Sequence, residues 1–151
     1  MYRISLLMLL LLHLGMGAYS QDKVYIGNQN TDSLYRVNAS DLGSLERVMS
    51  ASNPNGIAFF HANPTYPLFY AILSKIYRNH ANGSAPNDII TTTGQFNRGV
   101  AIDYIGKKIY WANQQDGYIK RANLDGSNQE PFLSSLIQPW DLEIDPINKK
   151  I

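Results

Sequence analysis

The 151-residue sequence contains no cysteine, and this absence excludes several kinds of structure and chemistry at once. Without a thiol the chain forms no disulfide, no zinc–thiolate site and no iron–sulfur cluster, and it offers no cysteine nucleophile. Charge is also sparse, since 17% of residues are charged and the formal net charge is +1. A nearly neutral chain lacks the basic footprint of a nucleic-acid-binding protein. The hydrophobic share of 44% is that of a globular core rather than of a disordered chain.

Long apolar runs are missing except near the N-terminus, where residues 4–14 are almost entirely apolar. Arg3 precedes this run and Ala18-Tyr19-Ser20 follows it with small residues at cleavage-site spacing, so the sequence predicts a secretory signal peptide over residues 1–20. A membrane anchor is the alternative, but the run is much shorter than the roughly 20 residues that a spanning helix needs. Because Arg3 is the only charged residue among the first twenty, residues 21–151 carry no net charge.

Two Asn-x-Ser sequons gain meaning if the protein is secreted, because they are acceptors for N-linked glycans. They begin at Asn38 and at Asn82, and both lie in polar, turn-like stretches. We therefore expect both asparagines to be glycosylated.

Three short motifs recur along the chain with a common period of about 42 residues. One motif ends in an arginine, at Arg36, Arg78 and Arg121. A second motif occupies residues 56–59, 99–103 and 141–145. The third matches Val24-Tyr25, Phe69-Tyr70 and Ile109-Tyr110, with Ile151 at the start of a fourth copy. Since the three motifs share one period, the sequence predicts a repeat protein.

Each period consists of short runs rich in Ile, Val, Tyr and Phe, separated by Asn, Gly, Asp and Pro, which is typical of strands joined by tight turns. The best-preserved period predicts four strands, at 99–103, 108–113, 118–122 and 131–133. Asp125-Gly126 is a turn signal after the third strand, because glycine tolerates the positive φ of such turns. Four strands in 40 to 50 residues form one blade of a β-propeller.

The best-preserved period resembles a low-density lipoprotein receptor class B repeat, also called a YWTD repeat. The resemblance is carried by Gly99-Val100-Ala101-Ile102-Asp103, by Ile109-Tyr110-Trp111-Ala112-Asn113 and by the run from Ile119 to Ser127. It is specific over residues 99–151 and weaker over 23–98. The chain also departs from the family pattern. Ala112-Asn113 replaces the Thr-Asp of the family name, the first two copies read Tyr25-Ile26 and Tyr70-Ala71, and Phe60 stands where Asp103 stands in the third.

The resemblance implies an all-β fold, a six-bladed propeller in which the Gly-to-Asp strand of each blade is innermost. In this register residues 23–50 supply strands two to four of one blade, 56–93 and 99–134 form two complete blades, and 141–145 begins another. Residues 21–151 then amount to about three four-stranded blades, which is half of a closed ring. An open half-ring exposes unpaired edge strands. A longer product, closure with a second chain and a short open array are therefore all open.

Motifs of common enzymes are absent from the sequence, which has no nucleophile elbow, P-loop or dinucleotide-binding signature. The one close acidic cluster is Asp141, Glu143 and Asp145. Asp145 matches Asp103 in the repeat, and both are expected to cap the turn after an inner strand. Asp141 and Glu143 are candidates for the central channel. No metal ion and no cofactor are predicted.

The aromatic residues separate into packing groups and one loop residue. The packing groups recur at a strand position and are predicted to lie between blades: Tyr25, Tyr70, Tyr110 and Trp111. Trp140 instead stands in the loop before an inner strand, at the position of Asn55 and Arg98 in the earlier copies. The family resemblance places this loop on the face around the channel mouth.

Non-repeating residues at one exposed position of a repeat are typical of a recognition surface, and Trp and Arg are enriched at binding hot spots. Asn55, Arg98 and Trp140 are therefore the candidate ligand-face residues, with ordinary loop variation as the alternative. The favoured function is a noncatalytic extracellular module that binds a protein ligand through the propeller face. It resembles the propellers of lipoprotein-receptor-related proteins and of nidogen-like matrix proteins.

Two other functions stay open. One is a calcium-dependent propeller hydrolase of the lactonase type, whose metal needs oxygen ligands that converge from several blades. The other is a structural matrix protein without a discrete ligand. Neither nucleic acid nor a membrane span is predicted, and the sequence does not choose between a secreted protein and the ectodomain of a longer receptor.

Overall fold

The computed structural model describes residues 23–38, 41–60, 68–84, 87–91, 96–145, 147–148 and 150–151. Within these ranges the protein is all-β, and none of its segments is a helix long and apolar enough to cross a membrane. The strands are β1 (Lys23–Asn28), β2 (Ser33–Asn38), β3 (Asp41–Ser50), β4 (Pro54–Phe59), β5 (Leu68–Ile72), β6 (Lys75–Asn79), β7 (Asn87–Thr91), β8 (Asn97–Asp103), β9 (Lys108–Asn113), β10 (Tyr118–Asn123) and β11 (Glu130–Leu133).

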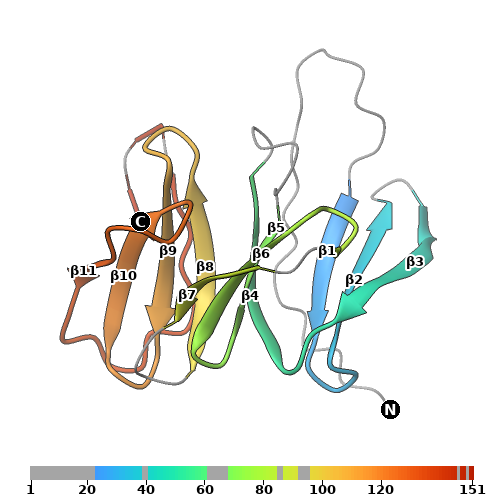
Figure 1. Ribbon diagram of the computed structural model, residues 1–151, viewed down its shortest axis with the longest axis horizontal. Helices are drawn as coiled ribbons and strands as arrows, with labels where there is room; N and C mark the ends of the chain where they lie inside the picture. The colour runs from blue at the N-terminus through green and yellow to red at the C-terminus, as the bar shows by residue number, and fades with distance from the viewer. Residues whose placement is uncertain are drawn as a thin grey trace.

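The strands form three antiparallel sheets in which each strand pairs with the next one along the chain. We call them blade 1 (β1–β3), blade 2 (β4–β7) and blade 3 (β8–β11). The blades stand side by side like the segments of a fan, with blade 1 on the right and blade 3 on the left of Figure 1. The four strands predicted for the best-preserved period are the four strands of blade 3, with ends that differ by at most two residues. This arrangement confirms the prediction of an all-β fold with about three blades.

Side chains on the second strand of a blade alternate between its two flanks, as the pleat requires. In β9, Ile109 and Trp111 face blade 2, whereas Tyr110 and Ala112 face the opposite flank. Both faces of the strand are buried, and Trp111 has no exposed surface. The predicted packing role of these residues is thus confirmed. Phe60, which occupies the position of Asp103 in the repeat, joins the apolar cluster between blades 2 and 3.

The β5 strand corrects one of the sequence matches. Ala58 pairs with Phe69 in blade 2, and the equivalent Ala101 pairs with Tyr110 in blade 3. Phe69 therefore matches Tyr110, and Tyr70 matches Trp111, so the predicted match of Phe69-Tyr70 with Ile109-Tyr110 is wrong by one residue. The predicted match followed the shared apolar-Tyr pair, but the connections on either side of β5 differ in length from those in blade 3, so residue type alone does not fix the register. The chain between β4 and β5 is longer than that between β8 and β9, and the β5–β6 turn is shorter than the β9–β10 turn.

The repeated arginine links neighbouring blades. Arg36 Nη1 donates a hydrogen bond to the carbonyl oxygen of Ala81 in blade 2, at 3.3 Å. Arg78 Nη1 makes the equivalent bond to the carbonyl oxygen of Leu124 in blade 3, at 3.4 Å. A hydrogen bond from a charged donor to a backbone carbonyl fixes position as well as adding stability. The arginine recurs in the repeat because it forms a hydrogen bond from one blade to the next.

The turns after the inner strands are capped as predicted. The Oδ1 atom of Asp103 accepts the backbone N–H groups of the residues two and three positions further along, at 3.0 and 2.8 Å. Asp145 Oδ1 accepts the equivalent two groups at 3.1 and 3.0 Å. These contacts are Asx-type turns, in which the side chain replaces a backbone acceptor.

The segment 141–145, predicted to be the first strand of another blade, does not form a strand in the described structure. Its one ladder contact is an isolated bridge between Asp145 and Lys150. A strand needs a hydrogen-bonded neighbour, and none of the described strands pairs with this segment. The segment nevertheless occupies an inner position, because Gly99 N–H donates to the carbonyl oxygen of Trp140 at 2.8 Å.

Glycine allows the inner segments to approach one another. A Cβ atom on Gly56 would lie 2.4 Å from the carbonyl oxygen of Arg98, and a Cβ atom on Gly99 would lie 2.7 Å from the Cα atom of Asp141. Only a residue without a side chain fits such contacts between backbones. The recurring glycine of the second motif is therefore the point at which successive blades touch.

Candidate functional site

The structure corrects the predicted loop position of Asn55 and Arg98, which are the second residues of the strands β4 and β8, whereas Trp140 precedes the inner segment 141–145 outside any strand. The starts of β4 and β8 lie at one edge of the blades, the lower edge in Figure 1. This edge combines the segments that lead into the inner positions with the β1–β2, β5–β6 and β9–β10 turns. Backbone hydrogen bonds join the two sets of loops. Asn97 N–H donates to the carbonyl oxygen of Leu73 at 2.8 Å, and Gln114 N–H donates to that of Phe96 at 3.1 Å. We call this edge the rim.

Arg98 is the centre of the rim. Its Nη1 donates to Asn55 Oδ1 at 2.7 Å, and its Nε donates to Gln114 Oε1 at 2.8 Å. The guanidinium carbon lies 4.3 Å from the centre of the Trp140 ring and 5.1 Å from that of Phe96. The structure therefore brings Asn55, Arg98 and Trp140 together, although more than forty residues separate each from the next. With their two further partners they form the rim cluster.

Burial and neutral partners define the electrostatics of the rim cluster. Partial burial lowers the pKa of Arg98 from its usual value, but a guanidinium remains protonated in proteins. Its hydrogen-bond acceptors are two neutral amides and its ring contacts are two aromatic faces, so no described carboxylate neutralises it. Cation–π contacts of this kind hold a guanidinium in place without cancelling its charge. The rim cluster thus presents a fixed positive charge.

The exposure of the three predicted residues differs. Trp140 is 50% exposed and Arg98 is half-buried, as a contact residue should be. Asn55 is only 4% exposed, which corrects the expectation that it lies on the surface. Its Oδ1 also accepts a hydrogen bond from Gln29 Nε2 at 2.9 Å. Asn55 therefore holds the Arg98 side chain in position from the buried side of the rim. Asn55 itself offers no surface for a ligand to contact.

Sequence reasoning missed two members of the rim cluster, Phe96 and Gln114. Phe96 is 38% exposed and adopts a positive φ of 67°. The sequence feature that could have identified Phe96 is that it is a large apolar residue in an otherwise polar loop. Gln114 follows Asn113 just as Gln29 follows Asn28, so the repeat itself marked the position. Leu73, in the β5–β6 turn, adds further exposed apolar surface beside Phe96.

The predicted channel candidates Asp141 and Glu143 are both exposed. Partial burial raises the pKa of the Glu143 carboxyl, and the neighbouring charge of Asp141 adds to the effect. In the described part of the chain, no group of three or more His, Asp or Glu side chains is placed to hold a metal ion.

The two predicted glycosylation sites lie in different surroundings. Asn82 is exposed in the β6–β7 connection, and its Oδ1 accepts the N–H and the hydroxyl of Ser84 at 3.0 and 2.7 Å. The equivalent turn at 125–127 has the same two hydrogen bonds, at 2.9 and 2.6 Å. The sequon therefore coincides with a structural turn. For Asn38, the serine of the sequon lies outside the described residues, as does the predicted signal peptide.

Comparison with known proteins identifies the repeats. No family model matches the chain. Low-density lipoprotein receptor-related protein 5 of Mus musculus is 32% identical over 75 residues, which is 49% of this chain and 5% of the relative. A chain in the crystal structure of a nidogen/laminin complex matches with a TM-score of 0.71 and 21% identity, over 83% of this chain and 49% of that one. These matches support the resemblance of the repeats to the YWTD type.

A second solved structure shares the fold of this chain. It is a catalytically inactive variant of virginiamycin B lyase from Staphylococcus aureus with quinupristin, with a TM-score of 0.60 and 13% identity, over 77% of this chain and 39% of that one. At these identities both solved structures show the fold alone, a β-propeller. The chain spans about half or less of the length of each protein that it matches.

Proposed function

We propose that the chain is a noncatalytic extracellular recognition module that binds a protein ligand through the rim cluster. The observation that carries the proposal is Arg98, which is stacked against two aromatic rings and held by two amides at the edge of the blades. A charged donor that is already fixed loses little conformational entropy when a ligand binds. Trp and Arg are also the residue types that most often dominate binding energy.

The surroundings of Arg98 fit contact with a protein. Trp140, Phe96 and Leu73 are 50%, 38% and 39% exposed, and they provide apolar contact area next to a positive charge. Interfaces typically combine such an aromatic centre with polar groups around it. The scaffold below the rim is shared between blades, whereas the residues at the rim differ from blade to blade. This combination favours a specific ligand.

The relatives support both the proposed recognition function and an extracellular location. One is named as a receptor-related protein, and the other structure is that of nidogen in complex with laminin. With the predicted signal peptide over residues 1–20, they favour an extracellular protein, whether secreted or part of a receptor ectodomain.

Site-specific photo-crosslinking tests this proposal. A photoreactive phenylalanine analogue replaces Trp140 in one variant and Tyr104 in the control. Tyr104 is 52% exposed, and its turn between β8 and β9 lies at the opposite edge of blade 3. After incubation with conditioned medium and matrix extract, we expect a crosslinked protein from position 140 and none from position 104.

The captured protein is then purified and its affinity for the unmodified chain is measured. We expect Trp140→Ala and Arg98→Ala each to weaken binding about tenfold or more, as hot-spot residues do, without changing the unfolding midpoint by more than a few degrees. Equal crosslinking from both positions, or unchanged affinity of both alanine variants, contradicts a binding site at the rim.

A further inference from the structure

The connection that follows β6 is built like the connection that follows β10. His80 N–H donates to the carbonyl oxygen of Ser84 at 3.2 Å, and Gly83 N–H donates to that of His80 at 2.9 Å. Residues 123–127 of blade 3 make the same two backbone hydrogen bonds, both at 2.9 Å. The glycines of the two turns also share a positive φ, of 80° and 86°. The two turns therefore have one conformation, and their side chains can be compared position by position.

Asn82 occupies the position of Asp125 in this comparison. The Oδ1 atom of each residue accepts the N–H and the hydroxyl of the serine two positions further along. An aspartate meets this need fully, because the turn uses only the oxygen. The asparagine adds an amide nitrogen, Nδ2, and none of the described residues accepts a hydrogen bond from it. The turn explains the oxygen of Asn82 and not its nitrogen.

The surroundings of Asn82 accommodate a large group. Asn82 is exposed, and blade 2 lies between blades 1 and 3, so both blades that flank the connection are described. The turn contacts blade 1 through other atoms. A Cβ atom on Gly83 would lie 2.9 Å from the carbonyl oxygen of Val48 in β3, and the carbonyl oxygen of Ala81 accepts a hydrogen bond from Arg36. A group attached to the Asn82 side chain therefore does not displace blade 1.

We propose that Asn82 carries an N-linked glycan, as the first residue of the sequon Asn82-Gly83-Ser84. The donor is an oligosaccharide on a lipid pyrophosphate carrier, the class of donor that modifies proteins entering the secretory pathway. Nδ2 loses a proton and forms a bond to the anomeric carbon of the first sugar. The bond from that carbon to the pyrophosphate breaks, and the carrier leaves with the electron pair and takes up the proton. The proposal rests on the extracellular location in the proposed function, and not on ligand binding.

The other sequon asparagine, Asn38, has a structural reason of its own. It is the last residue of β2, it is half-buried, and its Oδ1 accepts a hydrogen bond from Lys23 Nζ across the β1–β2 pair. Asn123 has the same place in blade 3, where its Oδ1 accepts from Lys108 Nζ at 2.7 Å without belonging to a sequon. The fold thus explains an asparagine at position 38, whereas it does not require one at position 82. The structure singles out Asn82 for this reason.

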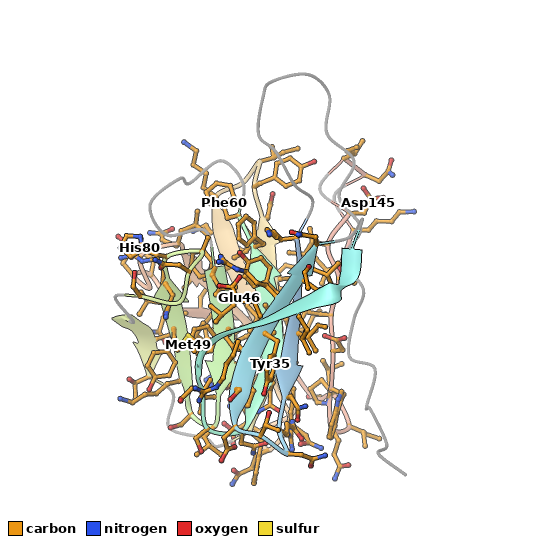
Figure 2. All side chains as sticks on the ribbon, turned by 90° about the vertical axis from the view of Figure 1, so that its right-hand side faces the viewer. Tyr35, Glu46, Met49, Phe60, His80 and Asp145 are labelled. Carbon is orange, nitrogen blue, oxygen red and sulfur yellow. The ribbon has the colours of Figure 1, made fainter. Side chains whose placement is uncertain are left out.

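The proposed glycan lies away from the rim cluster. The strand β6 begins at the β5–β6 turn, which belongs to the rim, and runs away from it, so the connection that follows β6 lies at the far end of the blade. Figure 2 shows His80, which begins this connection, in the upper part of the molecule, whereas the rim is the lower edge. A bulky, hydrated glycan at this place leaves Arg98 and Trp140 open to a ligand. It also keeps protein partners from the outer side of the junction between blades 1 and 2.

Expression of the full chain, with its own residues 1–20, in cultured mammalian cells tests the proposal. Asn38→Gln is introduced so that Asn82 begins the one remaining sequon. We expect treatment with peptide-N-glycosidase to increase the electrophoretic mobility of the secreted protein. Because this enzyme releases the glycan by hydrolysing the side-chain amide, mass spectrometry is expected to find aspartate at position 82.

Two substitutions in the Asn38→Gln chain separate modification from the structure of the turn. Asn82→Asp removes the acceptor nitrogen and keeps the oxygen, as in Asp125. It is expected to abolish the mobility change without shifting the melting temperature of the deglycosylated protein by more than a few degrees. Asp125→Asn, added to Asn82→Asp, creates the same sequon in the equivalent turn of blade 3. It is the matched positive control, since Asp125 is also exposed, and it is expected to restore the mobility change.

No mobility change in the Asn38→Gln chain overturns the proposal, and so does a mobility change that persists after Asn82→Asp. A change that appears only when residues 1–20 are replaced by the leader of a secreted protein overturns it too, together with the extracellular location. Crosslinking at position 140 reports separately on recognition. A glycan without crosslinking contradicts the recognition function alone, and crosslinking without a glycan contradicts this proposal alone.

Discussion

Replacement of Trp111 by alanine tests whether the packing between blades 2 and 3 holds the fold together. Trp111 has no exposed surface, and it packs among side chains of both blades. A buried Trp removes about 150 to 250 Å² from water, which corresponds to roughly 4 to 6 kcal/mol. Its indole N–H has no hydrogen-bond partner among the described residues, and an unsatisfied buried donor costs about 1 to 3 kcal/mol. Removing both contributions gives a net loss of about 3 kcal/mol.

The loss is measured by urea unfolding followed by far-ultraviolet circular dichroism, which does not depend on tryptophan fluorescence. The matched control is Trp140→Ala, the same substitution at a side chain that is 50% exposed, for which we expect a loss of less than about 1 kcal/mol. Trp111→Phe keeps a ring in the cluster and removes the unsatisfied N–H, so its loss is expected to be less than half that of alanine. If Trp111→Ala costs no more than Trp140→Ala, the contact between blades 2 and 3 is not the core of the protein.

The other predictions concern backbone contact, pH and calcium. Gly56→Ala is expected to lower the melting temperature by about 8 °C or more, because its Cβ would meet backbone atoms of β8 at 2.4 Å, whereas Gly27→Ala, whose nearest contact is 3.4 Å, is tolerated. Glu143→Gln is expected to raise the melting temperature near pH 7 but not below about pH 4. The raised pKa of Glu143 means that its protonated form favours folding, and this contribution is lost as the carboxyl ionises. An equal gain at both pH values contradicts that reasoning. Calorimetric titration with calcium is expected to show no stoichiometric binding, since no group of three or more acidic or histidine side chains in the described residues converges on one point, and tight binding revives the hydrolase alternative.

The strands were predictable where local signals agree with packing. The alternation of β9 and the Asp125-Gly126 turn mark blade 3 without any knowledge of its neighbours, because they depend on side-chain periodicity and on the φ that glycine tolerates. The match of Phe69 failed because it followed a shared apolar-Tyr pair at a strand whose two flanking connections differ in length from those in blade 3. The two length differences cancel, so Arg78 still keeps the repeat period. The motifs on either side of β5 therefore do not reveal the shift in register. Only the pairing of β4 with β5 fixes the register.

The candidate site was predictable in its members but not in their roles. The repeat placed Asn55, Arg98 and Trp140 at one position, and the structure brings them into contact. That Asn55 is buried and that Phe96 stacks on Arg98 could not be read from spacing, because both follow from the way in which two loops of one rim meet. The chemistry of the rim cluster is a property of neighbouring blades.

The sequence by itself determined the repeat, the strand content and the glycine at which blades touch, since each is encoded within one period of about 42 residues. Tertiary structure decided which flank each side chain covers, which residues surround Arg98, and that residues 141–145 hold an inner position without forming a strand. The physical reason is that periodicity and turn chemistry act between near neighbours in the chain. Burial, register and hydrogen-bond partners depend instead on segments about forty residues away.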